Sequence, residues 1–251
     1  MWGRFATLPA GAAFDALAAR YDSLWSDTAI GLSQRQAVWR HADPLFHPGQ
    51  RILDLGCGAG TDAVHYMARG VQIHAIDASA EMVRLAAARG VDARHLAIEN
   101  LSTLTGGFDG ALSNFGALNC VARLEPVAAE LGRLIRPSGW LAVCAMGRTC
   151  AWEVCHYLRG RQPSKAFRRW NPRGIPSSIG IHVTYPSVRQ LTRAFRRQFR
   201  LVRWCGIGLF VPPSYVRVSG TARLESLDRH LAHLPLARAL ADHRLLVWQR
   251  L

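Results

Sequence analysis

The sequence predicts an α/β fold, a doubly wound sheet of about seven strands with helices on both faces. Apolar runs typical of buried strands alternate with helical patterns, and the first two helices after the first strand each stop at a glycine, Gly70 and Gly90. A glycine-rich turn joins the first strand to its helix. With 251 residues and 49% hydrophobic content the chain can fill one core, so we expect a single domain over residues 1–251.

The segment ahead of the first strand is predicted to be helical. Residues 12–25 carry a helical pattern that places Tyr21 and other aromatic side chains near one face. A second helix is predicted over residues 33–41. The chain then reaches the first strand through two turns that contain proline.

The stretch from Arg51 to Thr61 is the centre of the prediction. A buried apolar strand carrying Asp54 runs into Gly56, Cys57, Gly58, Ala59 and Gly60. Glycine adopts left-handed backbone angles, and it lets a ligand approach the main chain where a Cβ would obstruct it. Such a strand-to-helix turn is typical of cofactor sites.

Two acidic residues indicate which cofactor the turn binds. The carboxylate of Asp54, just before the first glycine, would repel a pyrophosphate but attract a ligand that carries an ammonium and a sulfonium. Asp77 ends the next apolar run, where a carboxylate suits a ribose diol. Together they favour S-adenosylmethionine over a dinucleotide.

An acidic residue followed by x-G-x-G-x-G resembles the first motif of the class I S-adenosylmethionine-dependent methyltransferases, and the resemblance covers about residues 14–147. It implies a Rossmann-like fold, S-adenosylmethionine as cofactor and methyl transfer as the activity. The implied cofactor contacts include the turn with Cys57, and Ala78 next to Asp77. Residues 1–48 would form an N-terminal helical lid carrying Tyr21 over the cofactor; the alternative is an ordinary helix with Tyr21 in the core.

The predicted third strand, residues 93–98, departs from the family pattern. The family usually places an Asp-Ala pair here, which contacts the adenine through the acidic side chain and a backbone N–H. Ala97 and Ile98 occupy the matching positions and are followed by Glu99. The backbone of Ile98 and the side chain of Glu99 are therefore the candidates for the adenine contact.

The fourth strand is expected beside the first, and ligands bind beyond the carboxyl ends of parallel strands. The strand is predicted over residues 108–115. Ser113, Asn114 and Asn119, at or after its end, are predicted to face the reacting methyl group, and Asn114 also to touch the cofactor. In the alternative interpretation, Asn114 caps the following turn through its side chain.

Two insertions are predicted to cap the acceptor, residues 147–185 after strand five and residues 211–242 between strands six and seven. Gly206 and Gly208 suggest a bulge or a close ligand approach in strand six. The helical insertion that follows is expected to pack on the sheet or on a partner subunit. The candidate substrate-binding residues are Trp152, Tyr157, Trp204 and Tyr215.

Methyl transfer depends mainly on alignment, and orientation alone can supply about 7–11 kcal/mol of the barrier. A catalytic triad is therefore not required. A phenol or hydroxyl acceptor would be helped by a general base, and His156 and His182 in the first cap are the candidates. An amine or carbon acceptor could instead be oriented by Asn114 and Asn119.

The composition limits the possible location and ligands of the protein. Six cysteines form no C-x-x-C pair, which indicates reduced thiols rather than a metal site. No apolar run is long enough to span a bilayer and no signal pattern begins the chain, so a cytoplasmic location is expected. The net charge of +14 is concentrated in arginines of the second half, where it could serve a solvated surface, an anionic small molecule or lipid, or nucleic acid.

Three functions remain open from the sequence. The first is methyl transfer to a small-molecule acceptor, aromatic or acidic, similar to the enzymes of quinone and natural-product biosynthesis. The second is an RNA or protein methyltransferase that uses the basic half, although no specific nucleic-acid partner is expected. The third is a cofactor-binding regulatory protein without catalysis. A homodimer is compatible with each of the three.

Overall fold

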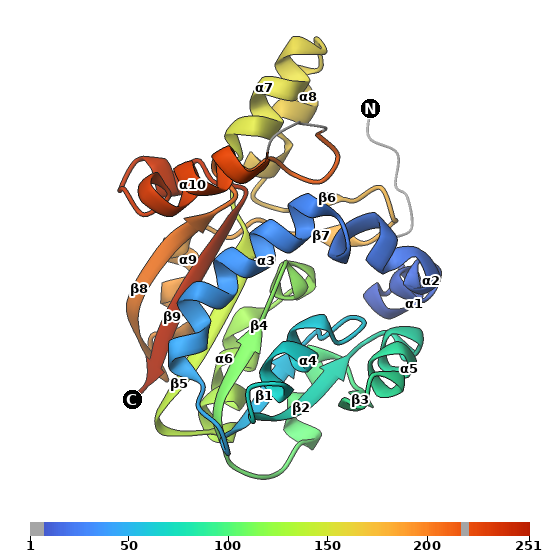
Figure 1. The fold of residues 1–251 in the computed structure, drawn as a ribbon, viewed down its shortest axis with the longest axis vertical. Coiled ribbons are helices and arrows are strands. Elements are labelled where there is room, and N and C mark those ends of the chain that lie inside the picture. Colours follow the sequence, from blue (N-terminus) through green and yellow to red (C-terminus); the bar gives the residue numbers. More distant parts are fainter. Residues whose placement is uncertain (1–7, 217–220) are drawn as a thin grey trace.

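One seven-stranded sheet organises the computed structural model, which describes residues 8–216 and 221–251 (Figure 1). The strands of this sheet are β1 (Arg51–Leu55), β2 (Gln72–Asp77), β3 (Asp92–His95), β4 (Phe108–Ser113), β5 (Ile135–Met146), β8 (Phe199–Ile207) and β9 (His243–Arg250). Their order is β3-β2-β1-β4-β5-β9-β8, and neighbours among β1 to β5 are parallel. β9 runs antiparallel to β5 and β8. The predicted fold class and the pairing of strand four with strand one are confirmed.

Helices cover both faces of the sheet (Figure 1). The larger ones are α3 (Ala29–Ala42), α4 (Thr61–Met67), α5 (Ala80–Ala88), α6 (Leu124–Leu134) and α9 (Val188–Phe195). Apolar residues of α3, α4 and α5, among them Val38 and Tyr66, bury one face. Residues of α6 and α9, among them Leu131 and Phe195, bury the other. Helices therefore bury both faces of the sheet, and loops follow the carboxyl ends of the parallel strands.

The N-terminal segment is broken where one helix was predicted. It forms α1 (Ala10–Asp15), α2 (Ala18–Tyr21) and a π-helical turn, η1 (Asp22–Ser26). Asp15 accepts a hydrogen bond from Ser79, ahead of α5, and Asp22 pairs with Arg89 at its other end. Those ends are about 15 Å apart at 1.5 Å per residue, whereas a continuous helix from residue 15 to 22 would span about 10 Å. The break lets the chain follow the whole of α5.

Two element boundaries were predicted wrongly. α3 begins at Ala29 rather than at residue 33, because the hydroxyl of Thr28 caps it by accepting from the N–H of Gly31 at 3.0 Å. β3 ends at His95, and the predicted strand residue Ile98 begins a 3-10 helix, η3 (Ile98–Thr103). Ile98 turns inward instead of extending the strand and lies buried beside the glycine turn.

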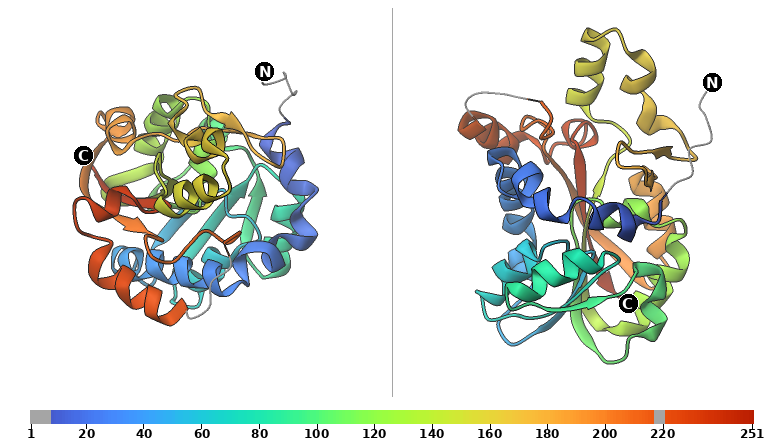
Figure 2. Two further views of the ribbon diagram at one scale, coloured as in Figure 1. Left: turned by 90° about the horizontal axis from the view of Figure 1, so that it is seen from above. Right: turned by 90° about the vertical axis from the view of Figure 1, so that its right-hand side faces the viewer.

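The insertion after β5 is more ordered than its irregular sequence indicated. It contains α7 (Ala151–Arg159), α8 (Pro163–Ala166), a short helix η5 (Arg168–Trp170), and a two-stranded ribbon of β6 (Ile175–Pro176) and β7 (His182–Val183). α7 and α8 stand as an arm above the carboxyl edge of the sheet, clearest in the side view of Figure 2. The arm is tied down at its base, where buried Glu153 receives hydrogen bonds from Arg168 and Arg169.

The second insertion packs on the N-terminal part of the chain. Its helix α10 (Thr221–Leu231) lies against α3, and buried Asp228 accepts the backbone N–H groups of residues 209–211 at 2.8–3.1 Å. The register irregularity of β8 lies at residues 201–203 rather than at Gly206 or Gly208, and a Cβ at Gly206 would lie 2.7 Å from the Cβ of Ala241. Short helices complete the fold: η2 (Asp43–Leu45), η4 (Ala117–Cys120) and η6 (Ala237–Ala239). Residues 1–7 of the expected lid and 217–220 of the second cap lie outside the described residues.

Candidate active site

The glycine turn after β1 adopts left-handed backbone angles at each of its three glycines. φ is +72° at Gly56, +53° at Gly58 and +84° at Gly60. A Cβ at Gly56 would lie 2.4 Å from the Cβ of Ala117, and one at Gly60 would lie 3.0 Å from the Cβ of Ala86. The first and third glycines are therefore required by packing.

Gly58 differs from its neighbours because the space beside it is open. A Cβ there would meet only one ring carbon of Tyr21, at 3.8 Å. Tyr21 lies in a row of aromatic rings between Phe14, 6.2 Å away, and Trp25, 5.0 Å away. The N-terminal segment thus covers the middle of the turn, and we call the region between Gly58 and the Tyr21 ring the cradle.

Asp77, at the end of β2, is bonded to this turn. One carboxylate oxygen accepts the N–H of Gly58 at 2.8 Å, and the other accepts the N–H of Ser79 at 2.8 Å. Burial raises the pKa of Asp77, and these two hydrogen bonds oppose that rise. Each oxygen keeps a second lone pair, so the carboxylate can still accept from the hydroxyls of a ribose.

Asp54 has a buried oxygen without a partner. The residue is 2% exposed, and its Oδ2 has no hydrogen bond within residues 8–216 and 221–251. Burial, reinforced by the carboxylate of Asp62, raises the pKa of Asp54 well above its ordinary value, and Arg35 opposes the rise. An unpaired buried carboxyl is costly, so this group fits a ligand that brings an ammonium to it. The open Gly58 and the orphaned Asp54 suit S-adenosylmethionine.

A polar cluster lies next to Asp54. Asp62, near the start of α4, forms an ion pair with Arg35 and accepts the indole N–H of Trp39 at 2.7 Å. The amide nitrogen of Asn114 lies 3.2 Å from each oxygen of Asp62. This cluster joins α3, α4 and the end of β4 around the buried carboxyl groups.

The chain immediately after β4 turns sharply. Phe115 has φ of +46°, an uncommon angle for a bulky residue, and its N–H donates to the side-chain oxygen of Asn114 at 3.0 Å. The guanidinium of Arg35 lies 5.0 Å from the centre of the Phe115 ring. Asn114 therefore does what the alternative interpretation proposed, capping the turn, and it also donates to Asp62. Strained backbone of this kind is enriched at functional sites.

The other predicted cofactor residues lie around the same turn. The thiol of Cys57 is buried, and burial raises its pKa. The carbonyl oxygen of Ala78 lies 3.0 Å from a ring nitrogen of His95, and Gly11 of α1 packs directly on it. Ile98 is buried beside Gly56, whereas Glu99 is exposed.

The side chain of Asn119 makes structural hydrogen bonds within the chain. Its amide nitrogen donates to the carbonyls of Met146, at 3.2 Å, and Thr184, at 2.7 Å, and its oxygen accepts the N–H of Met146 at 2.8 Å. Both amide protons are therefore already used. Asn119 ties η4 to the end of β5 and to the residue that follows β7.

The two histidines predicted as bases are both exposed. His156 lies on the projecting arm with its ring against Tyr157 and Tyr215, at 5.2 and 6.0 Å. His182 lies on β7, next to Gly174. Neither makes a recorded contact with the glycine turn among the residues that the structure describes, so the structure does not support a catalytic role for them.

The four predicted substrate residues divide between two places. Trp152 donates its indole N–H to the carbonyl of Phe210 at 3.1 Å, and the hydroxyl of Tyr215 donates to Glu153 at 2.8 Å. Tyr157 packs under Arg168, 5.3 Å from its ring centre. These three belong to the base and side of the arm. Trp204 lies away from them on β8, where Arg238 stacks on its ring at 3.9 Å.

The comparisons with known proteins agree with this geometry. Residues 52–139 match the family described as "Methyltransferase domain". The chain is 27% identical over 240 residues to a demethylmenaquinone methyltransferase of Paenarthrobacter aurescens, covering 90% of this chain and 89% of that protein. A demethylmenaquinone methyltransferase of Thermobifida fusca is 32% identical over 148 residues, covering 53% of this chain and 59% of the relative.

Solved methyltransferase structures share the fold. A possible histamine N-methyltransferase from Thermotoga maritima superposes with a TM-score of 0.61 at 18% identity, covering 96% of this chain and 99% of that one. A didemethyltoxoflavin N1-methyltransferase from Burkholderia thailandensis, bound to its substrate and S-adenosylhomocysteine, gives a TM-score of 0.58 at 19% identity, covering 98% and 92%. The chain contains a methyltransferase domain and has the fold of the class I S-adenosylmethionine-dependent methyltransferases.

Several site residues of this methyltransferase escaped the sequence interpretation. Arg35 and Asp62 form an ion pair across 27 positions, which only the docking of α3 brings about. His243 is the first residue of β9 and Asp242 immediately precedes it, and His243 pairs with Met146 at the end of β5. An antiparallel last strand starts at the edge of the sheet where the parallel strands end. Polar residues at its start could therefore have been predicted as site residues.

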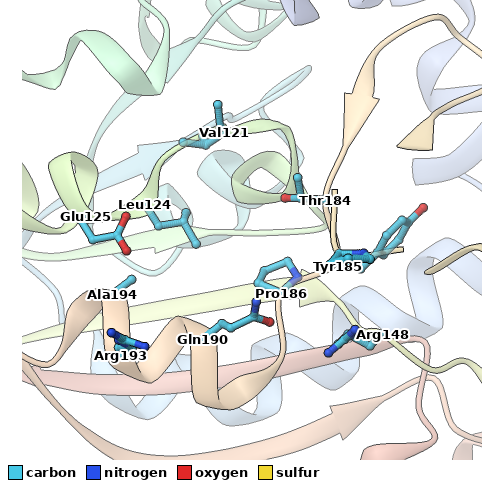
Figure 3. A pocket seen from close by; sticks show the side chains of 12 residues that line it. Val121, Leu124, Glu125, Arg148, Thr184, Tyr185, Pro186, Gln190, Arg193 and Ala194 are labelled. Carbon is cyan, nitrogen blue, oxygen red and sulfur yellow. The ribbon is translucent and has the colours of Figure 1, made fainter. Parts of the chain in front are cut away.

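Surface features of the methyltransferase lie apart from the glycine turn. A groove of about 370 Å³ runs between α6 and α9, and its lining includes Glu125, Arg148, Tyr185 and Arg193 (Figure 3). It contains none of the four predicted substrate residues. Among the described residues, no helix has the length and apolarity that a membrane span requires.

Proposed function

We propose that this methyltransferase acts on a hydroxylated aromatic small molecule of the kind that a reduced quinone presents. The observation that carries the proposal is the near full-length likeness to a demethylmenaquinone methyltransferase, over 90% of this chain and 89% of that protein. The residues at the carboxyl edge support it, because the rings of Phe115 and His243 lie 5.3 Å apart there and suit an aromatic acceptor.

For the cofactor we propose that Asp54 binds the ammonium end and Asp77 the ribose hydroxyls. Gly56, Gly58 and Gly60 would bring the main chain close to it, and S-adenosylmethionine supplies an activated methyl group on sulfur. The chain itself then has to bind the cofactor and the acceptor, orient them, and exclude water from the site. The remaining proposed contacts are those of Tyr21, Cys57, Ala78, Ile98, Glu99 and Asn114.

We further propose that residues 8–48 act as the lid, and that the arm and residues 209–216 wall the acceptor side. The ion pair of Asp22 with Arg89 and the hydrogen bond of Ser79 to Asp15 support a lid in its closed position. The arm is anchored through Glu153, to which Tyr215 also donates. The single domain over residues 1–251 remains part of this proposal.

The arginine excess has a structural use, which supports a small molecule rather than nucleic acid as partner. Arg169 pairs with two buried carboxylates, Arg250 donates to backbone carbonyls of residues 132 and 198, and Arg203 donates to the carbonyl of His41. All six cysteines are free thiols, which fits the cytoplasmic location that we propose. A homodimer also stays a proposal.

The direct test uses the purified chain with methyl-labelled S-adenosylmethionine. A reduced demethylated naphthoquinone, a simple catechol, a phenolic acid and total RNA serve as separate acceptors, with products followed by mass spectrometry. We expect label in a hydroxylated aromatic and none in RNA. Label in RNA, with none in any aromatic, would contradict the proposal.

A further inference from the structure

A buried histidine lies at the catalytic edge of the sheet, and methyl transfer as described above does not use it. His243 is the first residue of β9, and its pairing partners are Met146 at the end of β5 and Ile207 at the end of β8. Its ring meets the ring of Phe115 edge to face, with centres 5.3 Å apart. Because Phe115 follows Asn114 at the end of β4, His243 lies beside the edge where the acceptor must approach the methyl group.

The imidazole of His243 makes fewer hydrogen bonds than a buried polar group usually does. His243 is 9% exposed, and its Nδ1 has no hydrogen bond in the part of the chain that the structure describes. The nearest carboxylate oxygen belongs to Asp242, 3.4 Å from Nδ1. A buried ring nitrogen is normally paired, whereas Nδ1 is free to form a hydrogen bond with Asp242 when the ring gains a proton.

Asp242 is held firmly in place. Arg169 donates to its carboxylate at 2.8 Å and to its carbonyl at 3.2 Å. Its backbone N–H donates to Gly208 at 3.1 Å, and its carbonyl accepts the N–H of Gly147 at 2.9 Å. Although burial disfavours the charge, His243 and Arg169 more than offset it, and the pKa of Asp242 is lowered. The carboxylate is thus ionised and fixed beside the ring.

The charged groups around the ring come from two elements. Arg244 lies on β9, Asp242 immediately precedes this strand, and Arg169 reaches in from η5. Burial is the main cause that lowers the pKa of His243, the two arginines add to it, and Asp242 opposes them. The imidazole is therefore neutral at neutral pH, which is the form that accepts a proton.

We propose that His243 is the proton acceptor of the reaction and that Asp242 and Arg169 are its positioning residues. The inference rests on the hydroxylated aromatic acceptor proposed above. The O–H bond of the acceptor breaks and its proton binds the imidazole. The electron pair released on the acceptor forms the new bond to the methyl carbon, either at oxygen or through the ring at carbon. The carbon–sulfur bond breaks at the same time, and its pair stays on sulfur.

A carbon acceptor then loses its ring proton to water in a second step, and the electron pair of that C–H bond restores aromaticity without any oxidant. Asp242 stabilises the imidazolium formed in the first step, as an ionised carboxylate beside a histidine base generally does. A purely structural role would explain why His243 is buried. It would not explain why an unpaired ring nitrogen lies beside a fixed carboxylate at the reacting edge.

The test compares His243→Gln with the parent, Asp242→Asn and a control, His47→Gln, which changes an exposed histidine ahead of β1. We expect His243→Gln to lower kcat about 10²–10⁴-fold, the usual contribution of a general base, with unchanged affinity for S-adenosylhomocysteine by calorimetry. Asp242→Asn should lower kcat less, and the control should behave as the parent. The turnover of His243→Gln should recover as pH rises towards the pKa of the acceptor hydroxyl.

The parent should also lose activity at acid pH with a midpoint below about 6.5, the ordinary histidine value. This pH profile of the parent needs no variant, so it tests the inference even if His243→Gln fails to fold. Parental turnover in His243→Gln, or a variant loss that is the same at every pH, would overturn the inference alone. If the parent transferred no methyl to any hydroxylated aromatic, the proposed function itself would be wrong, and the proton acceptor with it.

Discussion

The N–H of Gly58 donates to the carboxylate of Asp77 at 2.8 Å, across 19 positions of the sequence. The bond joins the middle glycine of the turn after β1 to the acidic end of β2. The two features that indicated the cofactor are therefore one structural unit. Asp77 fixes the position of the turn and keeps lone pairs that can bind a ligand.

Asp77→Asn should weaken cofactor binding at least tenfold. The change removes charge-assisted hydrogen bonds worth about 1.5–3 kcal/mol each, and it places an amide against the N–H groups of Gly58 and Ser79. Calorimetry with S-adenosylhomocysteine measures the loss. Asp92→Asn, at an exposed carboxylate on β3, is the control and should keep the parental affinity.

Gly58→Ala and Gly90→Ala form a matched pair. Both glycines have positive φ, +53° and +82°, so each alanine should cost about 1–2 kcal/mol of folding free energy. No atom lies within 4 Å of a Cβ at Gly90, whereas a Cβ at Gly58 points into the cradle beneath Tyr21. Only Gly58→Ala should then lose cofactor affinity as well. Equal affinity in the two variants would show that the cradle is elsewhere.

Asp54→Asn should stabilise the cofactor-free protein. Burial raises the folded-state pKa of Asp54 above the ordinary value of 3.8, so the folded state holds its proton to higher pH than the unfolded state. That contribution favours folding at acid pH and is lost as pH rises from about 4 through the folded pKa. The gain in Tm of Asp54→Asn over the parent should therefore grow with pH to at least about 2 °C and then level off. A variant less stable than the parent at pH 8 would contradict the unpaired buried carboxylate.

Binding to nucleic acid should be weak and nonspecific. With a net charge of +14 the chain will bind polyanions at low salt. Counterion release should reduce that affinity by about 10³–10⁵ between 50 and 200 mM salt for six to ten phosphate contacts. Titrations with tRNA and duplex DNA at both salt concentrations measure it. Tight, salt-resistant binding to one RNA would point instead to an RNA methyltransferase.

The sequence predicted the parts of the fold and site that depend on local pattern. The strand, glycine turn and helix around Gly56 follow from the order of residues, because apolar runs and left-handed angles are short-range properties. The acidic end of β2 was predicted for the same reason. These features lie within about thirty residues of one another and require no knowledge of the tertiary packing.

The contacts that the sequence could not supply are long-range. Arg35 reaches Asp62 only because α3 docks beside α4, and His243 meets Phe115 only because β9 inserts next to β5. Asn119 was expected at the reaction, since its position after β4 is correct, but its amide is bonded to Met146 and Thr184. The partners of a side chain depend on which loops pack against it. The many prolines and glycines of residues 147–185 prevented a prediction of where that segment packs.

A titration of the chain with S-adenosylmethionine, run beside Asp54→Asn, tests the account most directly. The account predicts saturable binding of one cofactor per chain to the parent. It also predicts affinity at least tenfold weaker in the variant, because the ammonium loses a charged partner worth about 1.5–3 kcal/mol. Circular dichroism would confirm that the variant is folded. No binding to the parent, or equal affinity in a folded Asp54→Asn, would contradict a cofactor held by the buried carboxylate of β1.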